Sequence, residues 1–311
     1  MSNQTDLPVL VYDVGGSHVS AALCRPNRLT LGPVSRNGSP PGTCAETFFQ
    51  TLYSLGVQAS QDLSLVGGAQ LAIPAPFDYE TGISRMTHKL PGLYGVDLRG
   101  ALATLFGWQP EQVRFLHDSA AFLLGEIAAG AARGNTRAVG ITLGTGIGST
   151  FSVSGKVITH GFGMPPGGEI WNLPCGDGIL EDFLSAKAIQ REYERRTGSN
   201  REVISLAESA RDDTAARETF IGFGRTLGKA LRTILSDFAP DVVVLGGGIS
   251  HAAHLFLPAA TSELPETAFR LEVSAMIDCA ALVGAAAAWF NEGRISDGSN
   301  PDPVSTAAHG A

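Results

Sequence analysis

Three glycine-rich turns, each directly after an apolar and largely β-branched run, constrain the fold of this chain most strongly. They lie in residues 9–17 (VLVYDVGGS), 139–146 (VGITLGTG) and 242–248 (VVVLGGG). Glycine lets backbone N–H groups approach phosphate oxygens closely, because no side chain stands in the way. A single turn of this kind is weak evidence, since glycine also turns ordinary hairpins. Three of them, spread over the whole chain, predict a nucleotide held from several sides.

The two commoner nucleotide motifs are absent from the sequence. A P-loop needs G-x-x-x-x-G-K-[ST], but the Gly-Lys pairs at residues 155–156 and 228–229 are followed by Val157 and Ala230. The Rossmann fingerprint needs G-x-G-x-x-G, and in residues 144–149 (GTGIGS) the third glycine comes one place too early. Neither motif therefore accounts for the three turns.

Size and charge limit the partners of this chain. At 311 residues it exceeds a typical single domain, so two lobes are expected. Its formal net charge is −8 and no stretch is dense in Lys and Arg, so nucleic acid and anionic membranes are not expected as partners. An anionic nucleotide then requires backbone donors and a divalent cation to offset the repulsion.

The cysteines and the apolar stretches point to a reduced, cytoplasmic protein. Cys24, Cys44, Cys175 and Cys279 are scattered without a C-x-x-C pair, which argues against a zinc ribbon, a dithiol redox site or a disulfide framework. The first six residues show no basic region before an apolar stretch, so no signal peptide is predicted. The apolar run near residues 280–290 is too short to span a bilayer.

The hydrophobic pattern predicts one motif twice. Strands at residues 10–14 and 19–24 form a hairpin around the first glycine turn, and strands at 138–143 and 148–153 form another around the second. This duplication predicts two related lobes that face each other. The other expected elements are strands at 69–73, 113–117 and 242–245, and helices at 43–55, 96–106, 119–132, 180–195, 219–238 and 282–290.

Two irregular segments complete the predicted organisation. Residues 74–94 contain several Pro and Gly residues and are expected to form a binding loop. The tail at residues 296–311 is rich in Ser, Asp, Pro, Gly and Ala, and we expect it to be disordered.

Asp118 is the candidate catalytic residue. It follows the predicted strand 113–117 and opens a helix, at an N-cap position that Asp also takes for purely structural reasons. The functional interpretation is a general base that accepts a hydroxyl proton while the oxygen attacks phosphorus. Asp13, beside the first glycine turn, is the natural group to hold Mg²⁺ directly or through water, because this ion favours few carboxylates together with water and phosphate oxygens.

Two further acids, Glu169 and Glu181, are flanked by glycines and are suited to accept hydrogen bonds from neighbouring hydroxyls of a sugar. Paired carboxylates also occur in glycosidases. A glycosidase, however, leaves the three phosphate-type turns unexplained.

Taken together, these motifs resemble the ROK family of sugar kinases, within the actin–hexokinase–Hsp70 ATPase superfamily. The resemblance covers residues 9–288. The matching segments are residues 13–17 (DVGGS) and 144–148 (GTGIG) for the two phosphate motifs, 244–250 (VLGGGIS) for the adenosine motif, 73–82 and 90–92 for the sugar-lobe loop, 117–120 (HDSA) for the catalytic stretch, and 168–170 (GEI) and 180–181 (LE) for the two signature segments.

The resemblance implies an α/β, two-lobed actin-like ATPase (ribonuclease H-like) fold with a cleft between the lobes. The smaller N-terminal lobe is expected at residues 1–117, with the C-terminal helix near 280–292 packing back on it. The larger C-terminal lobe is expected at residues 118–279. The resemblance also implies a homodimer.

The resemblance assigns roles to the candidate residues. Asp118 is the base on the sugar 6-hydroxyl, and Glu169 and Glu181 bind sugar hydroxyls. The residues implied to hold the ATP phosphates are Asp13, Gly15, Gly16, Ser17, Gly144, Thr145 and Gly146, and those near the adenosine are Gly246, Gly247 and Gly248.

The chain departs from the family pattern at several positions. Asn172 stands where the family has a zinc-binding histidine that also touches the sugar, and Cys175 is the one cysteine nearby. Zinc needs four ligands for a closed structural site, so we predict no structural zinc. His117 replaces the usual Asn beside the catalytic Asp, and Lys89 lies where an Asn often contacts sugar hydroxyls. These three residues stay candidate sugar ligands, and Lys89 leaves open a sugar phosphate or a modified hexose.

The expected function is ATP- and Mg²⁺-dependent phosphorylation of a hexose 6-hydroxyl, with glucose as the substrate. The alternatives are a kinase for another hexose or an N-acetylated hexosamine, a polyphosphate-dependent glucokinase, and a sugar sensor of the family without catalysis. A sugar-responsive transcription factor would carry a helix-turn-helix segment before the first phosphate motif, where this sequence has residues 1–8. We therefore do not expect that class.

Overall fold

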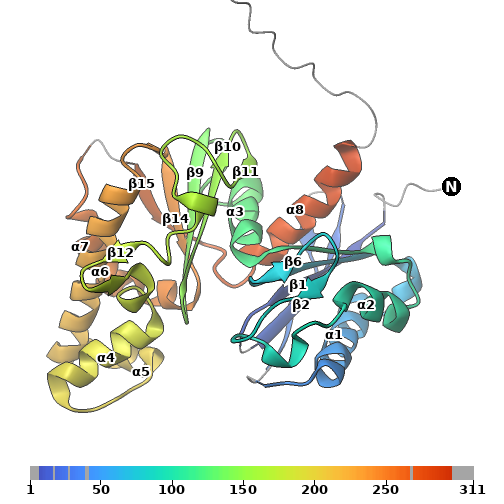
Figure 1. Ribbon diagram of the computed structural model, residues 1–311, viewed down its shortest axis with the longest axis horizontal. Coiled ribbons are helices and arrows are strands. Elements are labelled where there is room, and N and C mark those ends of the chain that lie inside the picture. Colours follow the sequence, from blue (N-terminus) through green and yellow to red (C-terminus); the bar gives the residue numbers. More distant parts are fainter. Residues whose placement is uncertain (1–6, 17, 27–28, 39–41, 267–268, 296–311) are drawn as a thin grey trace, which may run out of the picture.

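Two mixed sheets with the same strand order form the frame of the protein. The computed structural model describes residues 7–16, 18–26, 29–38, 42–266 and 269–295 (Figure 1). The first sheet has the order β3-β2-β1-β5-β8, with β4 also paired to β2, and the second has the order β11-β10-β9-β14-β15. In each sheet an antiparallel hairpin (β1–β2 or β9–β10) is followed by two strands parallel to its first strand. The structure thus contains the predicted duplicated hairpin.

The strands of the first sheet are β1 (Val9–Val14), β2 (His18–Arg25), β3 (Thr30–Leu31), β4 (Ser35–Gly38), β5 (Gly68–Ile73) and β8 (Val113–His117). Those of the second are β9 (Arg137–Leu143), β10 (Ile147–Val153), β11 (Lys156–Ile158), β14 (Val242–Gly246) and β15 (Arg270–Val273). Two short ribbons lie outside these sheets, β6 (Phe77–Asp78) with β7 (Ile83–Ser84), and β12 (Pro174–Cys175) with β13 (Gly178–Ile179).

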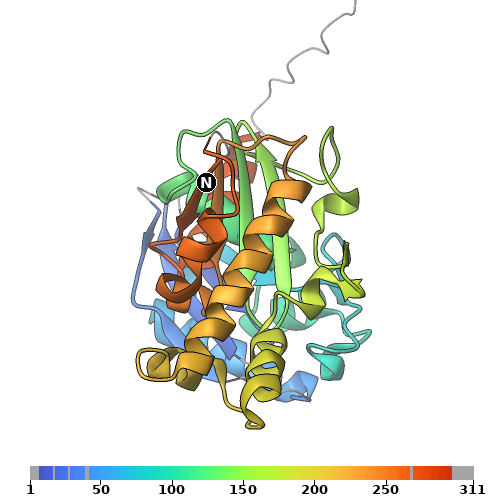
Figure 2. The ribbon, with the colours of Figure 1, turned by 90° about the vertical axis from the view of Figure 1, so that its left-hand side faces the viewer.

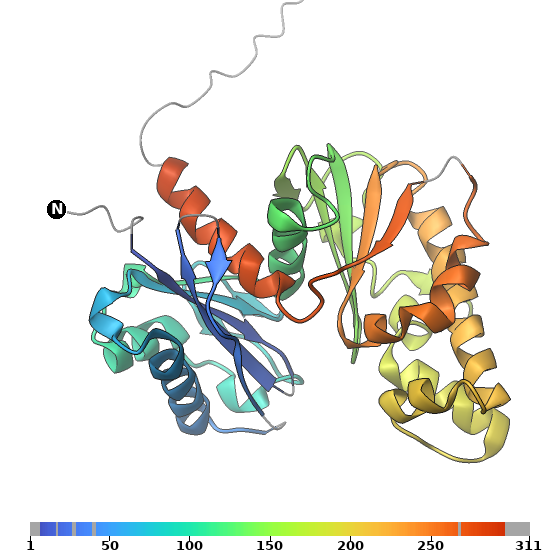
Figure 3. The ribbon, with the colours of Figure 1, turned by 180° about the vertical axis from the view of Figure 1, so that it is seen from behind.

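The described α-helices are α1 (Ala45–Ser60), α2 (Leu98–Phe106), α3 (Asp118–Ala129), α4 (Ala186–Thr197), α5 (Val203–Ser209), α6 (Thr214–Ile234), α7 (Ala253–Thr261) and α8 (Ala280–Ile295). Short 3₁₀ turns occur at η2 (Leu63–Leu65), η3 (Pro91–Leu93), η4 (Pro110–Gln112), η5 (Pro166–Gly168), η6 (Leu180–Asp182) and η7 (Gly248–Ala252). Helices α3 and α8 lie between the two sheets (Figures 1 and 3). Within the described ranges, no helix is both long and apolar enough to cross a lipid bilayer.

Successive side chains of β1 point to opposite faces of the first sheet. One face packs in the core, and the other bears the candidate metal-binding residue Asp13. Leu10 and Tyr12 pack in the core under α1 and α2, whereas Val9 and Val11 pack against α8. Since successive side chains of a strand point to opposite faces, Asp13 lies on the α8 face. The first sheet therefore presents this carboxylate toward the space between the two sheets.

The second sheet is covered on both faces. Its outer face packs against α6 and α7, of which α6 is the long helix in front of the sheet in Figure 2. Its inner face packs against α3 through Phe122 and Leu123. Because α3 starts directly after β8, it carries the chain from the edge of the first sheet to the inner face of the second.

Helices α3 and α8 cross at two glycines. A Cβ atom on Gly125 would lie against the carbonyl group of Ala280, and one on Gly284 would lie against the carbonyl group of Ala121. Only glycine permits this backbone-to-backbone approach. The crossing therefore fixes the distance between the two helices that separate the sheets.

Three element predictions differ from the structure in informative ways. The helix predicted at 180–195 begins at Ala186, because the Ser185 side chain accepts the N–H of Ala188 as its N-cap, and Leu180–Asp182 forms a separate turn. The helix predicted at 219–238 is shifted to Thr214–Ile234 by an N-cap at Asp213. The N-cap of α3 is His117, so Asp118 is its first helical residue and not its cap.

Other parts of the predicted organisation have different outcomes. Helices α5 and α7 were not predicted. Helix α8 packs on β1 and β2 of the first sheet. The lobe boundary between residues 117 and 118 stays a prediction, and the predicted disordered tail, 296–311, lies outside the described residues.

Candidate active site

The candidate catalytic and metal-binding carboxylates lie at one edge of the first sheet. Strands β1, β5 and β8 are parallel, with Asp13 opposite Ala72 and Ala72 opposite Leu116. Their carboxyl ends therefore meet at the same edge, which is where ligands bind in open α/β sheets. Asp118 follows β8 by one residue and lies at this edge with Asp13.

The two carboxylates interact electrostatically. Burial raises the pKa of Asp13 to about 7, the charge of Asp118 contributes in the same direction, and Arg36 opposes the shift. Two carboxylates within reach of each other disfavour double ionisation unless a cation lies nearby. This donor set suits a Mg²⁺ ion held by one carboxylate together with water and phosphate oxygens.

Asp118 is held at the start of α3 with its side chain about one-third exposed (34%). Its Oδ1 accepts the N–H of Ser119 at 2.7 Å, and His117 Nε2 lies 3.5 Å from the same oxygen. A hydrogen-bonded carboxylate that still reaches solvent has the fixed orientation and the access that a general base needs.

A hydroxyl network fixes the histidine beside Asp118. Ser119 Oγ is 2.6 Å from His117 Nδ1, and Thr150 Oγ1 donates to Ser119 Oγ at 3.0 Å. Ser119 is buried, and Thr150 belongs to β10 of the second sheet. The network therefore joins the edge of the first sheet to the second sheet.

The same strand positions the loop that carries Glu169. Ser149 Oγ donates to the carbonyl oxygen of Gly168 at 2.7 Å and accepts the N–H of Ile170 at 3.1 Å. These two backbone groups flank Glu169 on both sides. The Glu169 carboxylate accepts a hydrogen bond from Trp171 Nε1 at 2.5 Å.

Tyr79 joins the site, although the sequence did not single it out. Burial raises the pKa of the Tyr79 hydroxyl, and the charges of Asp118 and Glu169 contribute further. Its ring lies 6.1 Å from that of His117 in an edge-on arrangement. The one available signal was its place in the Pro- and Gly-rich stretch 74–94. Tyr79 therefore lies beside His117, the N-cap of α3.

Glu181 lies against the second glycine turn. Its Oε2 accepts the N–H of Ile147 at 3.2 Å, and a Cβ atom on Gly146 would collide with the same oxygen. The backbone N–H of Glu181 donates to the carbonyl oxygen of Trp171 at 3.0 Å. Glu181 therefore connects the Glu169 loop with the turn at residues 144–146.

The short hairpin β12–β13 occupies the segment in which the family pattern has a zinc site. Pro174 pairs with Ile179, and the N–H of Ile179 donates to Asp182 Oδ2 at 3.0 Å. Among the described residues, no group of three or more His, Cys, Asp or Glu side chains lies close enough to hold a metal ion. The absence of structural zinc stays a prediction, and Cys175 lies within this hairpin.

The first two glycine turns leave open space beside their backbones. A Cβ atom on Gly16 or on Gly144 would meet no other group within 4 Å. Gly144 donates its N–H to the carbonyl oxygen of Gly146 at 2.9 Å, and Thr145 at the tip is exposed. Gly15 donates to the carbonyl oxygen of His18, while Ser17 lies outside the described residues.

The three glycines of the third turn differ in their surroundings. Gly246 is buried, and a Cβ atom there would collide with the ring of Phe122. Gly247 has a φ of 81° and lies against the backbone of Leu143. Gly248 is exposed with open space around it. Gly248 is therefore the most open of the three, and their role near the adenosine stays a prediction.

Lys89 and Asn172 are exposed at the periphery. Lys89 lies between β7 and η3, and Asn172 follows Trp171. In the described part of the chain, neither side chain has a hydrogen bond or an ion pair with another candidate residue. Their role as sugar ligands stays a prediction.

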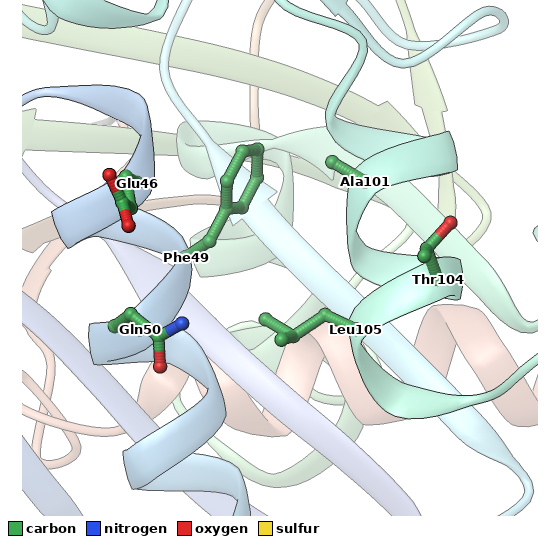
Figure 4. Close-up of a pocket in the computed structure, with 6 residues that line it drawn as sticks. All are labelled: Glu46, Phe49, Gln50, Ala101, Thr104 and Leu105. Carbon is green, nitrogen blue, oxygen red and sulfur yellow. The ribbon is translucent and has the colours of Figure 1, made fainter.

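A hollow of about 410 Å³ lies elsewhere, between α1 and α2. Figure 4 shows Phe49 and Leu105 facing each other across it. These helices cover the face of the first sheet opposite to Asp13. The hollow is therefore separate from the candidate active site.

The family model described as the ROK family matches residues 9–292. The chain belongs to the ROK family. It is 30% identical to a glucokinase of Thermotoga maritima over 289 residues, covering 80% of this chain and 84% of that protein. It is 26% identical to an N-acetyl-D-glucosamine kinase of Haemophilus influenzae, covering 78% and 85%. These relatives confirm the prediction of an ATP-dependent sugar kinase of the ROK family.

The fold comparison agrees with the family. A ROK family glucokinase from Streptomyces griseus, solved in complex with glucose and AMPPNP, has a TM-score of 0.74 at 21% identity and covers 90% of this chain and 98% of that one. A ROK hexokinase from Thermus thermophilus has a TM-score of 0.73 at 24% identity, with coverages of 94% and 100%. The predicted actin-like ATPase fold is confirmed.

Proposed function

We propose that this ROK-family kinase transfers the terminal phosphoryl group of ATP to the 6-hydroxyl of a hexose, with glucose as its preferred substrate. The observation that carries the proposal is the position of Asp118 and Asp13 at one sheet edge. The Glu169 loop is held by Ser149 of β10, whose neighbour Thr150 bonds to Ser119 beside Asp118. In this proposal Asp13 acts on the phosphate side, Asp118 is the general base and Glu169 binds the sugar. These are the groups that the reaction requires.

In this proposal Asp118 accepts the proton of the 6-hydroxyl as its oxygen attacks phosphorus. The Ser119 N–H keeps the carboxylate in place, so little reorganisation is needed during the reaction. Glu169 and Glu181 accept hydrogen bonds from sugar hydroxyls, and His117, Lys89 and Asn172 are further candidate contacts. Binding both substrates between the sheets excludes water that would otherwise be phosphorylated.

The glycine turns hold the nucleotide in this proposal. The turns at residues 15–17 and 144–146 bind the ATP phosphates through backbone N–H groups other than those of Gly15 and Gly144, which donate to His18 and Gly146. The turn at residues 246–248 approaches the adenosine, with Gly248 as its exposed member. Asp13 would hold Mg²⁺ directly or through water. When bound, that ion neutralises charge on the phosphate oxygens.

Two relatives support different sugars. This chain is 30% identical to the Thermotoga maritima glucokinase, which favours glucose as the substrate. Its identity of 26% to the Haemophilus influenzae N-acetyl-D-glucosamine kinase makes an N-acetylated hexosamine the second candidate. Polyphosphate is the alternative phosphoryl donor. We further propose a cytoplasmic homodimer, on the strength of the family resemblance.

A coupled ADP-release assay tests the proposal, with glucose, N-acetylglucosamine, other hexoses and a sugar-free control. We expect the highest kcat/KM with glucose, and more activity with ATP than with polyphosphate. Asp118→Asn should lower kcat by about two to four decades, because it removes the positioned base, while the Kd for glucose changes little. Asp177→Asn, at an exposed turn, is the matched control. Near-normal turnover by Asp118→Asn would contradict the assignment.

A further inference from the structure

Arg36 shares a row of the first sheet with the candidate Mg²⁺-binding residue. Asp13 lies opposite Ser20 in the β1–β2 pair, and Ser20 lies opposite Arg36 in the β2–β4 pair. Residues directly opposite each other across strands point to the same face. Arg36 Nε donates to Ser20 Oγ at 3.1 Å, which holds the guanidinium on the Asp13 face.

The guanidinium is close enough to Asp13 to act on it and open enough to bind a ligand. Arg36 opposes the burial effect that raises the pKa of Asp13. Its side chain is 47% exposed. Arginine has five N–H donors in a planar fork, of which the bond to Ser20 uses one. The other donors, including the Nη2 group near Asp278, can serve a phosphate beside Asp13.

One carboxylate oxygen joins Arg36 to the opposite side of the molecule. Asp278 Oδ1 lies 3.5 Å from Arg36 Nη2 and 3.4 Å from His251 Nε2. Asp278 belongs to the segment that leads from the second sheet into α8 (Figure 3), and His251 belongs to η7, directly after the third glycine turn. Through Asp278, Arg36 on the Asp13 face of the first sheet is therefore connected to His251, which follows the third glycine turn.

This ion-pair cluster is loose. Both distances exceed those of ordinary N–H···O hydrogen bonds, and the side chains of Asp278 and His251 are 65% and 54% exposed. Exposed pairs of this kind contribute little to stability. A bound anion with several oxygens can therefore replace the Asp278 carboxylate at low energetic cost.

We propose that Arg36 and His251 bind phosphate oxygens of the nucleotide, and that Asp278 competes with those oxygens in the nucleotide-free protein. The proposal rests on the ATP-dependent function above. The planar fork of arginine matches phosphate geometry, and a chain with a net charge of −8 needs local cations to attract a polyanion. Nucleotide binding then exchanges one anion for another between the two sheets.

The proposal predicts that two variants weaken nucleotide binding and that a third strengthens it. Arg36→Gln should raise the Kd for Mg²⁺-bound AMPPNP by about tenfold, since it removes charge-assisted bonds to phosphate. His251→Gln should weaken binding in the same direction and by less, because an imidazole presents fewer N–H donors than a guanidinium. Asp278→Asn removes the competing charge and should lower the Kd.

The measurement is isothermal titration calorimetry on the full chain, with thermal unfolding to verify folding. Arg25→Gln removes a charge from the end of β2, outside the row, and should leave the Kd unchanged. Adenosine is the second probe, and its affinity should not respond to Arg36→Gln because it carries no phosphate.

Three outcomes would overturn the inference. An unchanged AMPPNP affinity in folded Arg36→Gln would show that the guanidinium does not contact phosphate. Weaker binding by Asp278→Asn would show that the cluster is a structural bridge. A wild-type protein that binds no AMPPNP would contradict the proposed function as well, which separates the two failures.

Discussion

The hydroxyl of Ser149 holds the carbonyl group of Gly168 at 2.7 Å and so fixes the loop that carries Glu169. The same hydroxyl accepts the N–H of Ile170 at 3.1 Å, on the other side of Glu169. Ser149 is buried and belongs to β10, a central strand of the second sheet. The segment that carries Glu169, the proposed sugar ligand, is therefore held in place by the second sheet.

Ser149→Ala should raise the KM for the sugar by about tenfold and leave the KM for ATP nearly unchanged. The change leaves two buried backbone groups without their partner, which costs about 1–3 kcal/mol per group and loosens Glu169. Steady-state kinetics with each substrate varied in turn provide the measurement. Ser152→Ala is the control, because this buried serine of the same strand donates to Ala138 and not to the Glu169 loop. Equal effects of both variants would refute a specific positioning role.

Glu181→Ala should raise the KM for ATP as well as the KM for the sugar. Its carboxylate accepts the N–H of Ile147 at the end of the second glycine turn, so its loss frees that turn to move. Glu169→Ala is the matched comparison, since its carboxylate bonds to Trp171 and not to the turn. That variant should raise the sugar KM alone. An unaffected ATP KM in Glu181→Ala would exclude a link between the two substrates through this residue.

The sequence allowed the shared position of Asp13 and Asp118 at one sheet edge to be predicted, because the signals for it are local. Asp13 is the next-to-last residue of the apolar strand β1, and Asp118 directly follows the strand β8. The carboxyl ends of parallel strands lie at the same edge of a sheet. Ser149 and Tyr79 were missed because their roles depend on partners that the fold brings from elsewhere in the chain. A buried serine in a β-strand carries no sequence signal for the carbonyl that it will bind.

The helix boundaries show a similar limit. The apolar pattern near residues 180–195 suits one helix, but Leu180–Asp182 forms a separate 3₁₀ turn and the Ser185 side chain accepts the N–H of Ala188 as an N-cap. The chain therefore turns before α4 can begin at Ala186. The sequence also treats the three glycines at residues 246–248 alike, as a turn that binds a ligand. In the structure their surroundings differ, because Gly246 packs against the ring of Phe122 and Gly248 has open space around it.

Asp213→Ala should lower the free energy of unfolding by about 1 kcal/mol at neutral pH, because it removes an N-cap. Asp213 Oδ1 accepts the N–H of Ala216 at 3.0 Å, and Oδ2 accepts the Tyr193 hydroxyl at 2.8 Å. These bonds hold the pKa of Asp213 below its ordinary value of 3.8. Urea unfolding at several pH values provides the measurement, with the exposed Asp212→Ala as the control.

The pH dependence of this effect has a definite sign. Since the pKa of the folded state is the lower one, the stabilisation by Asp213 is present above 3.8 and is lost as the pH falls through the folded-state value. The difference between wild type and Asp213→Ala should therefore shrink in acid. A difference that stays constant down to strongly acid pH would show that the ionised carboxylate is not the stabilising group.

Gly125→Ala should destabilise the protein by several kcal/mol and lower kcat, because the new methyl group would meet the Ala280 carbonyl group where α3 and α8 cross. Moving α3 also moves Asp118 at its first position, so chemistry and folding respond together. Gly222→Ala is the matched control. It lies in α6 with nothing within 4 Å of its would-be Cβ, so alanine there should stabilise by about 0.5–1 kcal/mol and leave kcat unchanged. Urea unfolding and steady-state kinetics on both variants test the pair, and a neutral Gly125→Ala would mean that the helices can separate without cost to the site.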